Sequence, residues 1–267
     1  MNEIIGYALS TLVGISLGII GGGGSILTVP ILVYVFGLGP EISTSYSLFI
    51  VGLTALAGSF NYYRNGLVNL KAALIFSVPS LIAVFLTRKF IMPALPDVIF
   101  QSGSFQYSRP MFIMTVFAAL MIAASVSMIR KSKLPDPTKL KPGHHYTLIF
   151  LEGIIVGVLT GFVGAGGGFL IIPALVLLAG IPMKEAVGTS LLIIAIKSLL
   201  GFTGDISAGV NIDWMFLAIV SVFTVAGIFA GSTLAKKIHG DKLKPAFGWF
   251  VLAMGIYIML RETLFKS

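Results

Sequence analysis

The residues best suited to chemistry are one lysine and two glycine clusters, all set among apolar residues. Lys197 stands alone in the apolar segment LLIIAIKSLL. A charge at membrane depth is costly, so we expect Lys197 to face protein or a water-filled cavity and to attract an anion. Backbone N–H groups exposed by glycines, followed by a helix N-terminus, can bind an oxyanion. The two clusters are Gly21, Gly22, Gly23, Gly24 and Ser25, and Gly164, Ala165, Gly166, Gly167 and Gly168.

Each of these interpretations has a plainer alternative. The glycines could simply let helices pack closely, and Lys197 could reach the membrane surface or pair with a carboxylate such as Asp205. Asp205 and Glu152 are the carboxylates best placed to carry protons, although an interfacial position in water also explains them. Four hydroxyl groups near the starts of two later segments could bind oxyanion oxygens or cap a helix. These are Ser45, Ser47, Thr189 and Ser190.

Several other chemistries lack the residues that they need. The chain contains no cysteine, which excludes disulfides, thiolate metal sites and cysteine catalysis. The three histidines, His144, His145 and His239, fall in polar connecting segments, which gives little support to a metal site or a catalytic dyad. Neither glycine cluster follows a strand or contains the GK[ST] of a nucleotide-binding P-loop. We therefore expect no enzyme activity, no cofactor and no metal.

The composition requires a membrane protein. The 267 residues are 57% hydrophobic and only 10% charged, whereas a soluble domain is about a quarter charged. Basic residues give a net charge of +8 but sit beside apolar segments, where they report orientation and lipid contact rather than nucleic-acid binding. The apolar runs are continuous rather than alternating, which predicts an all-α polytopic bundle and not a barrel. They cover residues 4–20, 26–36, 43–60, 72–86, 111–129, 146–163, 169–179, 186–202, 214–234 and 247–260.

The chain contains an internal repeat. A shift of 143 residues aligns the segment from Gly14 with the segment from Gly157. The same register places Pro30 on Pro173 and Gly66 on Gly209 without a gap. The sequence thus predicts two homologous transmembrane halves, residues 1–130 and 146–267, joined by a polar cytoplasmic linker at 131–145. Many secondary transporters are built from such repeats.

Each half opens with an apolar element that is too long for one membrane crossing. A continuous helix over residues 4–36 would measure about 50 Å, against a hydrocarbon core of about 30 Å. If the chain turns back at the glycines, most basic loop residues fall on the cytoplasmic side, with Arg88, Lys89 and Arg109 among those outside. A glycine-broken hairpin followed by three helices then gives each half the opposite orientation. Both termini lie outside, and the two clusters can converge on one site at the midplane.

Four segments of the sequence resemble a known family. They are GIIGGGGSILTVP, GFVGAGGGFLIIPAL, VGTSLLII and YYRNGLVNLKAAL. Together they are similar to the TauE/SafE sulfite exporter family of bacterial membrane transporters, over nearly the whole chain. The resemblance implies a multi-pass protein of the bacterial inner membrane that moves sulfite, thiosulfate or an organosulfonate such as sulfoacetate. The first half departs from the usual pattern at STSYSLF, where the second half has GTSLLII.

The resulting hypothesis is a secondary transporter that moves a small anionic substrate by alternating access. The glycine clusters, Lys197 and the four hydroxyl groups form its expected substrate site. A passive anion channel is the alternative, because channels also contain inverted repeats with half-helices. The sequence leaves open whether protons or sodium ions are coupled to transport and whether the chain forms a homo-oligomer. The expected partners are the substrate and the lipid bilayer, and no nucleic acid.

Overall fold

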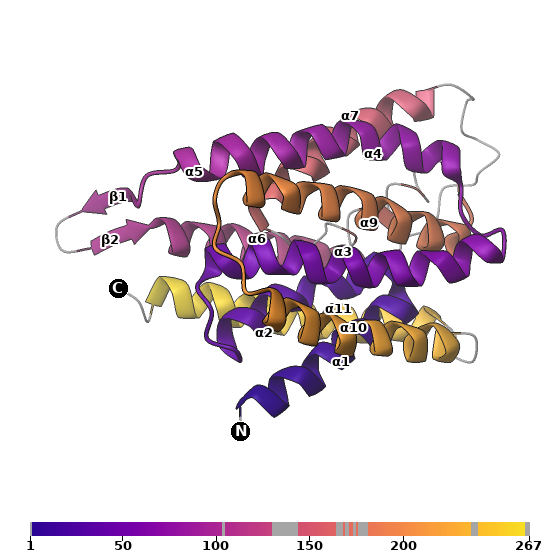
Figure 1. The fold of residues 1–267 in the computed structure, drawn as a ribbon, viewed down its shortest axis with the longest axis horizontal. Coiled ribbons are helices and arrows are strands. Elements are labelled where there is room, and N and C mark those ends of the chain that lie inside the picture. Colours follow the sequence, from indigo (N-terminus) through magenta and orange to yellow (C-terminus); the bar gives the residue numbers. More distant parts are fainter. Residues whose placement is uncertain are drawn as a thin grey trace.

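The computed structural model describes residues 2–102, 105–129, 144–163, 168, 171, 172, 175, 181–235 and 240–264. This part of the chain is a bundle of long helices that lie roughly along one direction (Figure 1). The helices are α1 (Asn2–Ile20), α2 (Thr28–Tyr34), α3 (Pro40–Arg64), α4 (Leu70–Leu86), α5 (Met92–Ala94), α6 (Arg109–Ile129), α7 (His144–Val163), α9 (Met183–Ser207), α10 (Trp214–Ala235) and α11 (Gly240–Leu264). A 3-10 segment, η1 (Gly21–Leu27), precedes α2, and a π-helical segment, η2 (Thr87–Ile91), joins α4 to α5.

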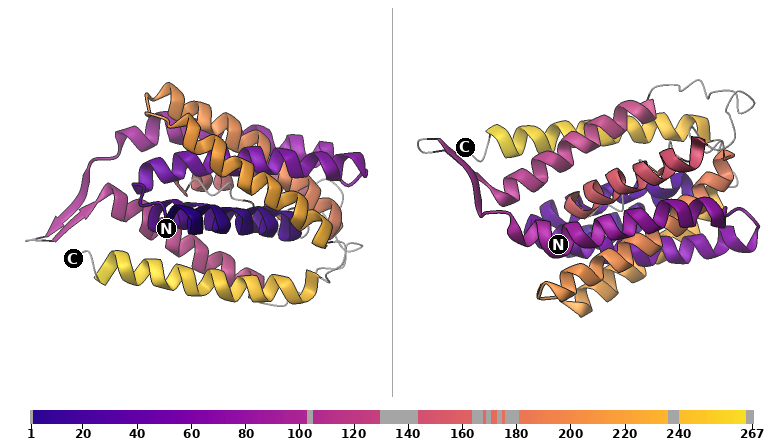
Figure 2. Two further views of the ribbon diagram at one scale, coloured as in Figure 1. Left: turned by 60° about the horizontal axis from the view of Figure 1, so that its bottom comes forward. Right: turned by 90° about the horizontal axis from the view of Figure 1, so that it is seen from above.

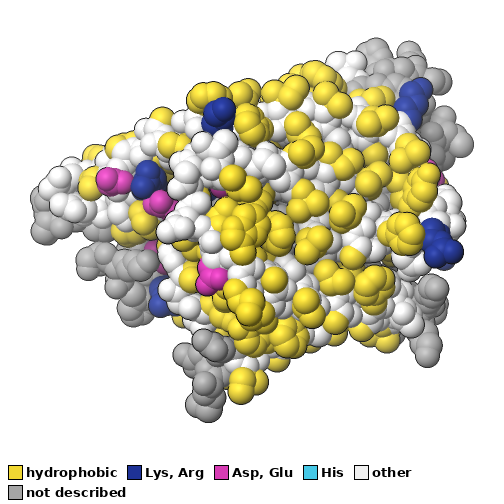
Figure 3. Space-filling model, viewed as in Figure 1, with side chains coloured by type: hydrophobic (Ala, Val, Ile, Leu, Met, Phe, Trp, Pro, Cys, Tyr) yellow, Lys and Arg dark blue, Asp and Glu magenta, His cyan; other side chains and the backbone are white. Residues whose placement is uncertain are grey.

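The bundle has the lengths and the surface of a multi-pass membrane protein. Four stretches of helix are long and apolar enough to cross a membrane, namely Pro40–Arg64, Leu70–Ala94, Lys184–Ser207 and Trp214–Leu234. Four shorter apolar helices accompany them, at Ile4–Ile20, Gly24–Tyr34, Arg109–Ala123 and Ile149–Val163. Hydrophobic side chains cover the middle of the face in Figure 3, and charged side chains gather toward its two ends. A bilayer core can surround such a surface because it presents few polar groups to lipid.

The first apolar element breaks at its glycines, as the sequence predicts. Helix α1 ends at Ile20, and Gly21 has φ +70°, a left-handed conformation that favours glycine. The chain then folds back along α1, since a Cβ added at Gly24 would lie 2.7 Å from the carbonyl carbon of Ser16. A Cβ added at Gly6 would likewise lie 2.7 Å from a ring carbon of Phe36, just beyond α2. The chain thus turns back on itself at the glycines of the first half, whereas most of residues 164–180 lie outside the described residues.

Helices of the first half pack on helices of the second half. The main pairs are α1 with α10, α4 with α7, α3 with α9, and α6 with α11. Glycines allow the closest approaches, as is common in membrane helices. A Cβ added at Gly18 of α1 would lie 2.5 Å from the carbonyl oxygen of Ile228 in α10. One added at Gly157 of α7 would lie 2.5 Å from the carbonyl oxygen of Ser80 in α4.

Two hydrogen bonds tie the ends of the central helices together. Near the start of α3, the hydroxyl of Tyr46 accepts a 2.7 Å hydrogen bond from the backbone N–H of Asp213, which directly precedes α10. Near the start of α9, Thr189 Oγ1 accepts a 2.8 Å bond from the N–H of Asn69, which directly precedes α4. Short connections join α3 to α4 and α9 to α10, so α3 and α9 run in opposite directions.

The segment after α5 differs from the sequence prediction of a plain loop. It contains two antiparallel strands, β1 (Val98–Ser102) and β2 (Phe105–Ser108), which project beyond the helices (Figures 1 and 2). We call the end of the bundle that carries these strands the β end. Arg109, at the start of α6, anchors them to α3 by bonding Asp97 Oδ1 at 3.1 Å and Glu41 Oε1 at 2.8 Å. Helix α1 begins and α11 ends toward this same end of the bundle.

Arg88 requires a second correction, because the sequence places it in an external loop. The helix instead continues through η2, and the Arg88 side chain is only 2% exposed. Its charge is tolerated there because Nη1 lies 3.5 Å from Oδ2 of Asp205, a buried carboxylate on α9. A buried charge is expected to be paired in this way.

Candidate functional site

Members of the two glycine clusters meet in the interior of the bundle. A Cβ added at Gly22 would lie 2.7 Å from the carbonyl carbon of Gly168, and one added at Gly168 would lie 2.6 Å from that of Gly22. The two backbones are therefore in direct contact, and neither position has room for a side chain. Gly168 is the member of the second cluster that the structure describes, whereas Gly164, Ala165, Gly166 and Gly167 lie outside the described residues.

The first cluster runs along one face of α9. A Cβ added at Gly21 would lie 3.4 Å from Ser190 Oγ, and one added at Gly22 would lie 2.5 Å from Cδ1 of Ile194. Residues three or four apart share a helix face, so Ser190, Ile194 and Lys197 follow one another along this face. The glycine segment therefore contacts the turns of α9 that precede the turn carrying Lys197.

Lys197 is fully buried near the middle of α9. Its Nζ donates a 3.1 Å hydrogen bond to Thr160 Oγ1 on α7. Among the residues that the structure describes, no Asp or Glu lies within ion-pair distance of Lys197, and Asp205 pairs with Arg88 instead. A buried ammonium without a counter-charge is costly, and a bound anion would remove that cost. The surroundings of Lys197 therefore favour a negatively charged ligand.

The hydroxyl groups predicted from the sequence have different surroundings. Thr189 accepts the N–H of Asn69 and so helps to hold the start of α4. Ser190 donates to the carbonyl oxygen of Val187 at 2.8 Å. Ser45 and Ser47 are buried, and their hydroxyls have no hydrogen-bond partner within the described part of the chain. In the first cluster, Ser25 donates to the carbonyl oxygen of Gly22 at 2.7 Å, so its hydroxyl stabilises the bend itself.

The two predicted carboxylates lie away from the meeting point of the glycines. Asp205 follows Lys197 by eight residues on α9, which is about 12 Å along the helix axis. Glu152 precedes Thr160 by eight residues on α7, toward the opposite end of the bundle. Its Oε2 is buried and has no hydrogen-bond partner among the described residues.

Sequence reasoning missed two residues beside this region. Thr160 holds the ammonium of Lys197, yet nothing distinguishes it from other threonines in apolar segments. Arg88 follows the apolar run 72–86 after one residue, Thr87, and stands next to Lys89, a spacing that is typical of a loop flanking a membrane span. Asp205 could have indicated a buried basic partner such as Arg88, because a carboxylate in an apolar helix needs an opposite charge.

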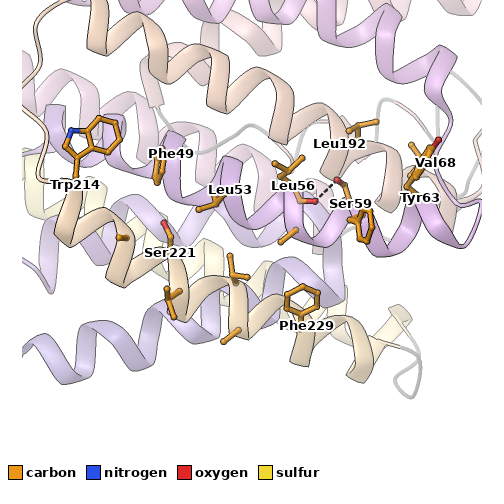
Figure 4. Close-up of a pocket in the computed structure, with 16 residues that line it drawn as sticks. Phe49, Leu53, Leu56, Ser59, Tyr63, Val68, Leu192, Trp214, Ser221 and Phe229 are labelled. Atoms are coloured by element: carbon orange, nitrogen blue, oxygen red, sulfur yellow. Dashed lines mark hydrogen bonds between the residues drawn. The ribbon is translucent and has the colours of Figure 1, made fainter.

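A large groove elsewhere has a different character. It has a volume of about 1080 Å³ and lies between α3 and α10, with Trp214 toward one end and Tyr63 toward the other (Figure 4). Its lining is almost wholly apolar, and Ser59, Tyr63 and Ser221 are the lining residues that carry hydroxyl groups. Many of these side chains are exposed on the outside of the bundle, including Phe229 at 51%. The groove thus faces the lipid and lacks the charge that an anion site needs.

The fold and the site together define a class of protein. A multi-pass helical bundle with a broken helix and a buried cation near its centre has the architecture of a membrane transporter. The comparison with known families agrees. The chain belongs to the sulfite exporter TauE/SafE family, whose model matches residues 7–258, and this confirms the resemblance seen in the sequence.

Individual relatives are similar over nearly their whole length. A probable membrane transporter protein of Xylella fastidiosa (strain Temecula1) is 30% identical over 260 residues, which cover 94% of this chain and 92% of that protein. The probable membrane transporter protein YunE of Bacillus subtilis (strain 168) is 26% identical over 258 residues, covering 90% of this chain and 89% of YunE. The chain is therefore a membrane transporter of this family.

Proposed function

We propose that this chain is a secondary transporter that moves a small sulfur-containing anion across the bacterial inner membrane by alternating access. Sulfite, thiosulfate and organosulfonates such as sulfoacetate are the proposed substrates. The observation that carries the proposal is the fully buried Lys197, which has no acidic partner in the described part of the chain and lies beside the glycine break. The family description, which names sulfite export, supports the sulfur chemistry of the substrate.

Two kinds of group would hold the substrate in the proposed site. The ammonium of Lys197 would supply the charge, while N–H groups of the two glycine segments would supply directed hydrogen bonds. Ser190 would add a hydroxyl from the same face of α9. Backbone donors suit an oxyanion because they are fixed in place and carry only partial charge, so the ion can leave again.

Alternating access in this proposal rests on two repeats of opposite orientation, residues 1–130 and 146–267, joined by the linker 131–145. Three observations support it. The packing of α1 on α10 corresponds to that of α7 on α4, and α3 runs opposite to α9. The bonds made by Tyr46 and Thr189, which align in the two halves, join equivalent helices. Gly66 and Gly209 also align, and both end their helices with positive φ, +67° and +81°.

We assign proton coupling to Glu152 in this scheme. Asp205 forms an ion pair with Arg88, whereas Glu152 forms no ion pair among the described residues and has a buried oxygen without a hydrogen-bond partner there. A carboxylate that can gain a proton in one state and lose it in another needs such freedom. Transport by a Glu152→Gln variant should consequently lose its dependence on a proton gradient while exchange of substrate persists.

The proposal is tested with the variant Lys197→Met in purified protein and in liposomes. Uptake of labelled sulfite or thiosulfate should fall, and the dissociation constant should rise at least about tenfold, because a hydrogen bond to a charged group is worth about 1.5–3 kcal/mol. The ligand-free variant should melt at a higher temperature than the wild type, since a buried unpaired charge has been removed. Lys89→Met, at an exposed lysine, is the matched control and should behave like the wild type.

Unchanged affinity in Lys197→Met would remove Lys197 from the site. Counterflow separates the transporter from a channel: preloaded unlabelled substrate should drive a transient accumulation of labelled substrate in the liposomes. A flux that never saturates and gives no accumulation would establish the passive channel instead.

A further inference from the structure

The most unusual buried group outside the proposed central site is the guanidinium of Arg88. It lies in η2, where the π-helical turn continues α4, and its side chain is 2% exposed. Nη1 donates a 3.1 Å hydrogen bond to Thr44 Oγ1 on α3 and lies 3.5 Å from Oδ2 of Asp205. Nε and Nη2 are buried and have no hydrogen-bond partner among the described residues. Unpaired buried donors of this kind are costly and point to a missing partner.

The free nitrogens form one edge of the guanidinium plane. Nε–H and one N–H of Nη2 point the same way along that edge, which matches two oxygens bonded to a single carbon, sulfur or phosphorus atom. Asp205 and Thr44 occupy Nη1, so they fix the orientation of the plane without covering this edge. The arrangement leaves both nitrogens of this edge buried and without a hydrogen-bond partner among the described residues.

The packing of α7 against the segment that carries Arg88 places this edge near the surroundings of Lys197. Lys197 bonds Thr160 on α7, and the next residue, Gly161, packs on the start of η2, where its added Cβ would lie 2.5 Å from Cβ of Thr87. Thr87 directly precedes Arg88. Both cations therefore border the interface between α4, α7 and α9, and Arg88 lies nearer the β end. Arg88, Lys197 and Asp205 together carry a net charge of +1, which an anion would neutralise.

We propose that Arg88 is a second anion-binding residue, which takes two oxygens of the transported oxyanion on its Nε–Nη2 edge. Asp205 acts as a positioning residue that holds this edge open. The inference deepens the proposed function and rests on it. Arg88 would bind the ion between the β end and Lys197, and the two-point geometry would select sulfite or a sulfonate over a monatomic anion.

The test is the affinity of the full-length protein in detergent for sulfite and for sulfoacetate, measured by isothermal titration calorimetry. Arg88→Lys keeps the charge but removes the edge, and it should weaken binding of both anions at least about tenfold. Arg109→Lys is the matched control, because all three nitrogens of Arg109 already bond Glu41, Asp97 or the carbonyl oxygen of Leu95. It should bind both anions as the wild type does.

Asp205→Asn separates a binding role from a structural one. The asparagine keeps an oxygen that can accept from Nη1 and so keeps the edge in position, but it lacks the carboxylate charge that competes with the anion. If Arg88 binds the substrate, binding should therefore tighten at least about twofold. If the ion pair only stabilises the fold, Arg88→Lys and Asp205→Asn should both weaken anion binding and both lower the melting temperature. That result would overturn the inference. The double variant Arg88→Gln with Asp205→Asn removes both charges together, so it keeps no unpaired ion. It should fold, with a melting temperature close to the wild type, yet bind weakly.

The outcomes distinguish this inference from the proposed function. Wild-type affinity in Arg88→Lys or in the double variant, alongside weakened binding in Lys197→Met, would overturn the role of Arg88 alone. Absence of saturable binding of either anion by the wild type would overturn the proposed function and this inference with it.

Discussion

Helices α3 and α9 align in the sequence repeat. They make equivalent hydrogen bonds at their ends, but only α9 carries a buried charge. Tyr46 of α3 and Thr189 of α9 align in the repeat, and each accepts the N–H of a residue that precedes a helix of the opposite half. Lys197 aligns with Thr54, whose hydroxyl lies 2.6 Å from the carbonyl oxygen of Ile50 and 2.7 Å from Thr224 Oγ1. One position carries a charge, and its counterpart carries a satisfied hydroxyl.

The difference separates the demands of folding from the demands of binding. Each half has to connect the same helices, so the contacts that hold helix ends together occur twice. In the proposed function, a single anion at a shared centre needs no second lysine opposite the first, and two like charges there would repel each other. Arg88 follows the same rule, because its aligned position is Gly231, which packs closely on the backbone of Ile15 in α1. Each buried cation therefore has an uncharged counterpart.

The largest expected effect is a loss of stability at the contact between the two glycine segments. Gly22→Ala and Gly168→Ala each place a Cβ against backbone atoms of the other glycine segment, so the backbones must move apart. Overpacking of this kind costs about 1–3 kcal/mol or more, and the melting temperature should fall by about 5 °C or more. The measurement is thermal unfolding in detergent, followed by circular dichroism.

Gly39→Ala is the control for these variants. Gly39 has a φ of −61°, and an added Cβ would meet nothing within 4 Å, so alanine fits without strain. If Gly22→Ala melted at the same temperature as Gly39→Ala, the contact between the two glycine segments would be disproved.

Much of the bundle could be predicted from the sequence, because apolar length directly reports membrane helices. The run 186–202 became Met183–Ser207, and the run 214–234 became Trp214–Ala235. The break at Gly21 could be predicted for the same reason, since the apolar element that contains the glycine cluster was too long to cross once. The repeat also indicated which positions in the two halves would correspond.

What the sequence could not supply were contacts between distant segments. Arg88 looks like a loop residue until Asp205, on a different helix, is placed 3.5 Å away. Thr189 looks as suitable for an anion as Ser190 until Asn69 is seen to occupy its oxygen. The strands β1 and β2 escape prediction because their pairing with each other and the anchoring of Arg109 stabilise them, not a strong local pattern.

A smaller change tests the duplicated contacts. Tyr46→Phe and Thr189→Val each remove one hydroxyl while keeping the bulk of the side chain. Each lost hydrogen bond should cost about 1 kcal/mol and lower the melting temperature by about 2–4 °C. The two losses should add in the double variant, because the bonds lie at opposite ends of the bundle. Sulfite affinity should stay unchanged in both, and weaker binding by Thr189→Val would return Thr189 to the substrate site.

The smallest expected effect separates two serines that align in the repeat. Ser190 faces Gly21 beside the glycine break, so Ser190→Ala should weaken sulfite binding by roughly two- to tenfold, the worth of one neutral hydrogen bond. Ser47 is buried with no hydrogen-bond partner among the described residues, so Ser47→Ala removes an unsatisfied group and should leave affinity and stability nearly unchanged. Calorimetry on the two variants in parallel makes each the control for the other. Equal weakening would mean that both halves contribute hydroxyls to the anion, and that the site is more symmetric than its charges.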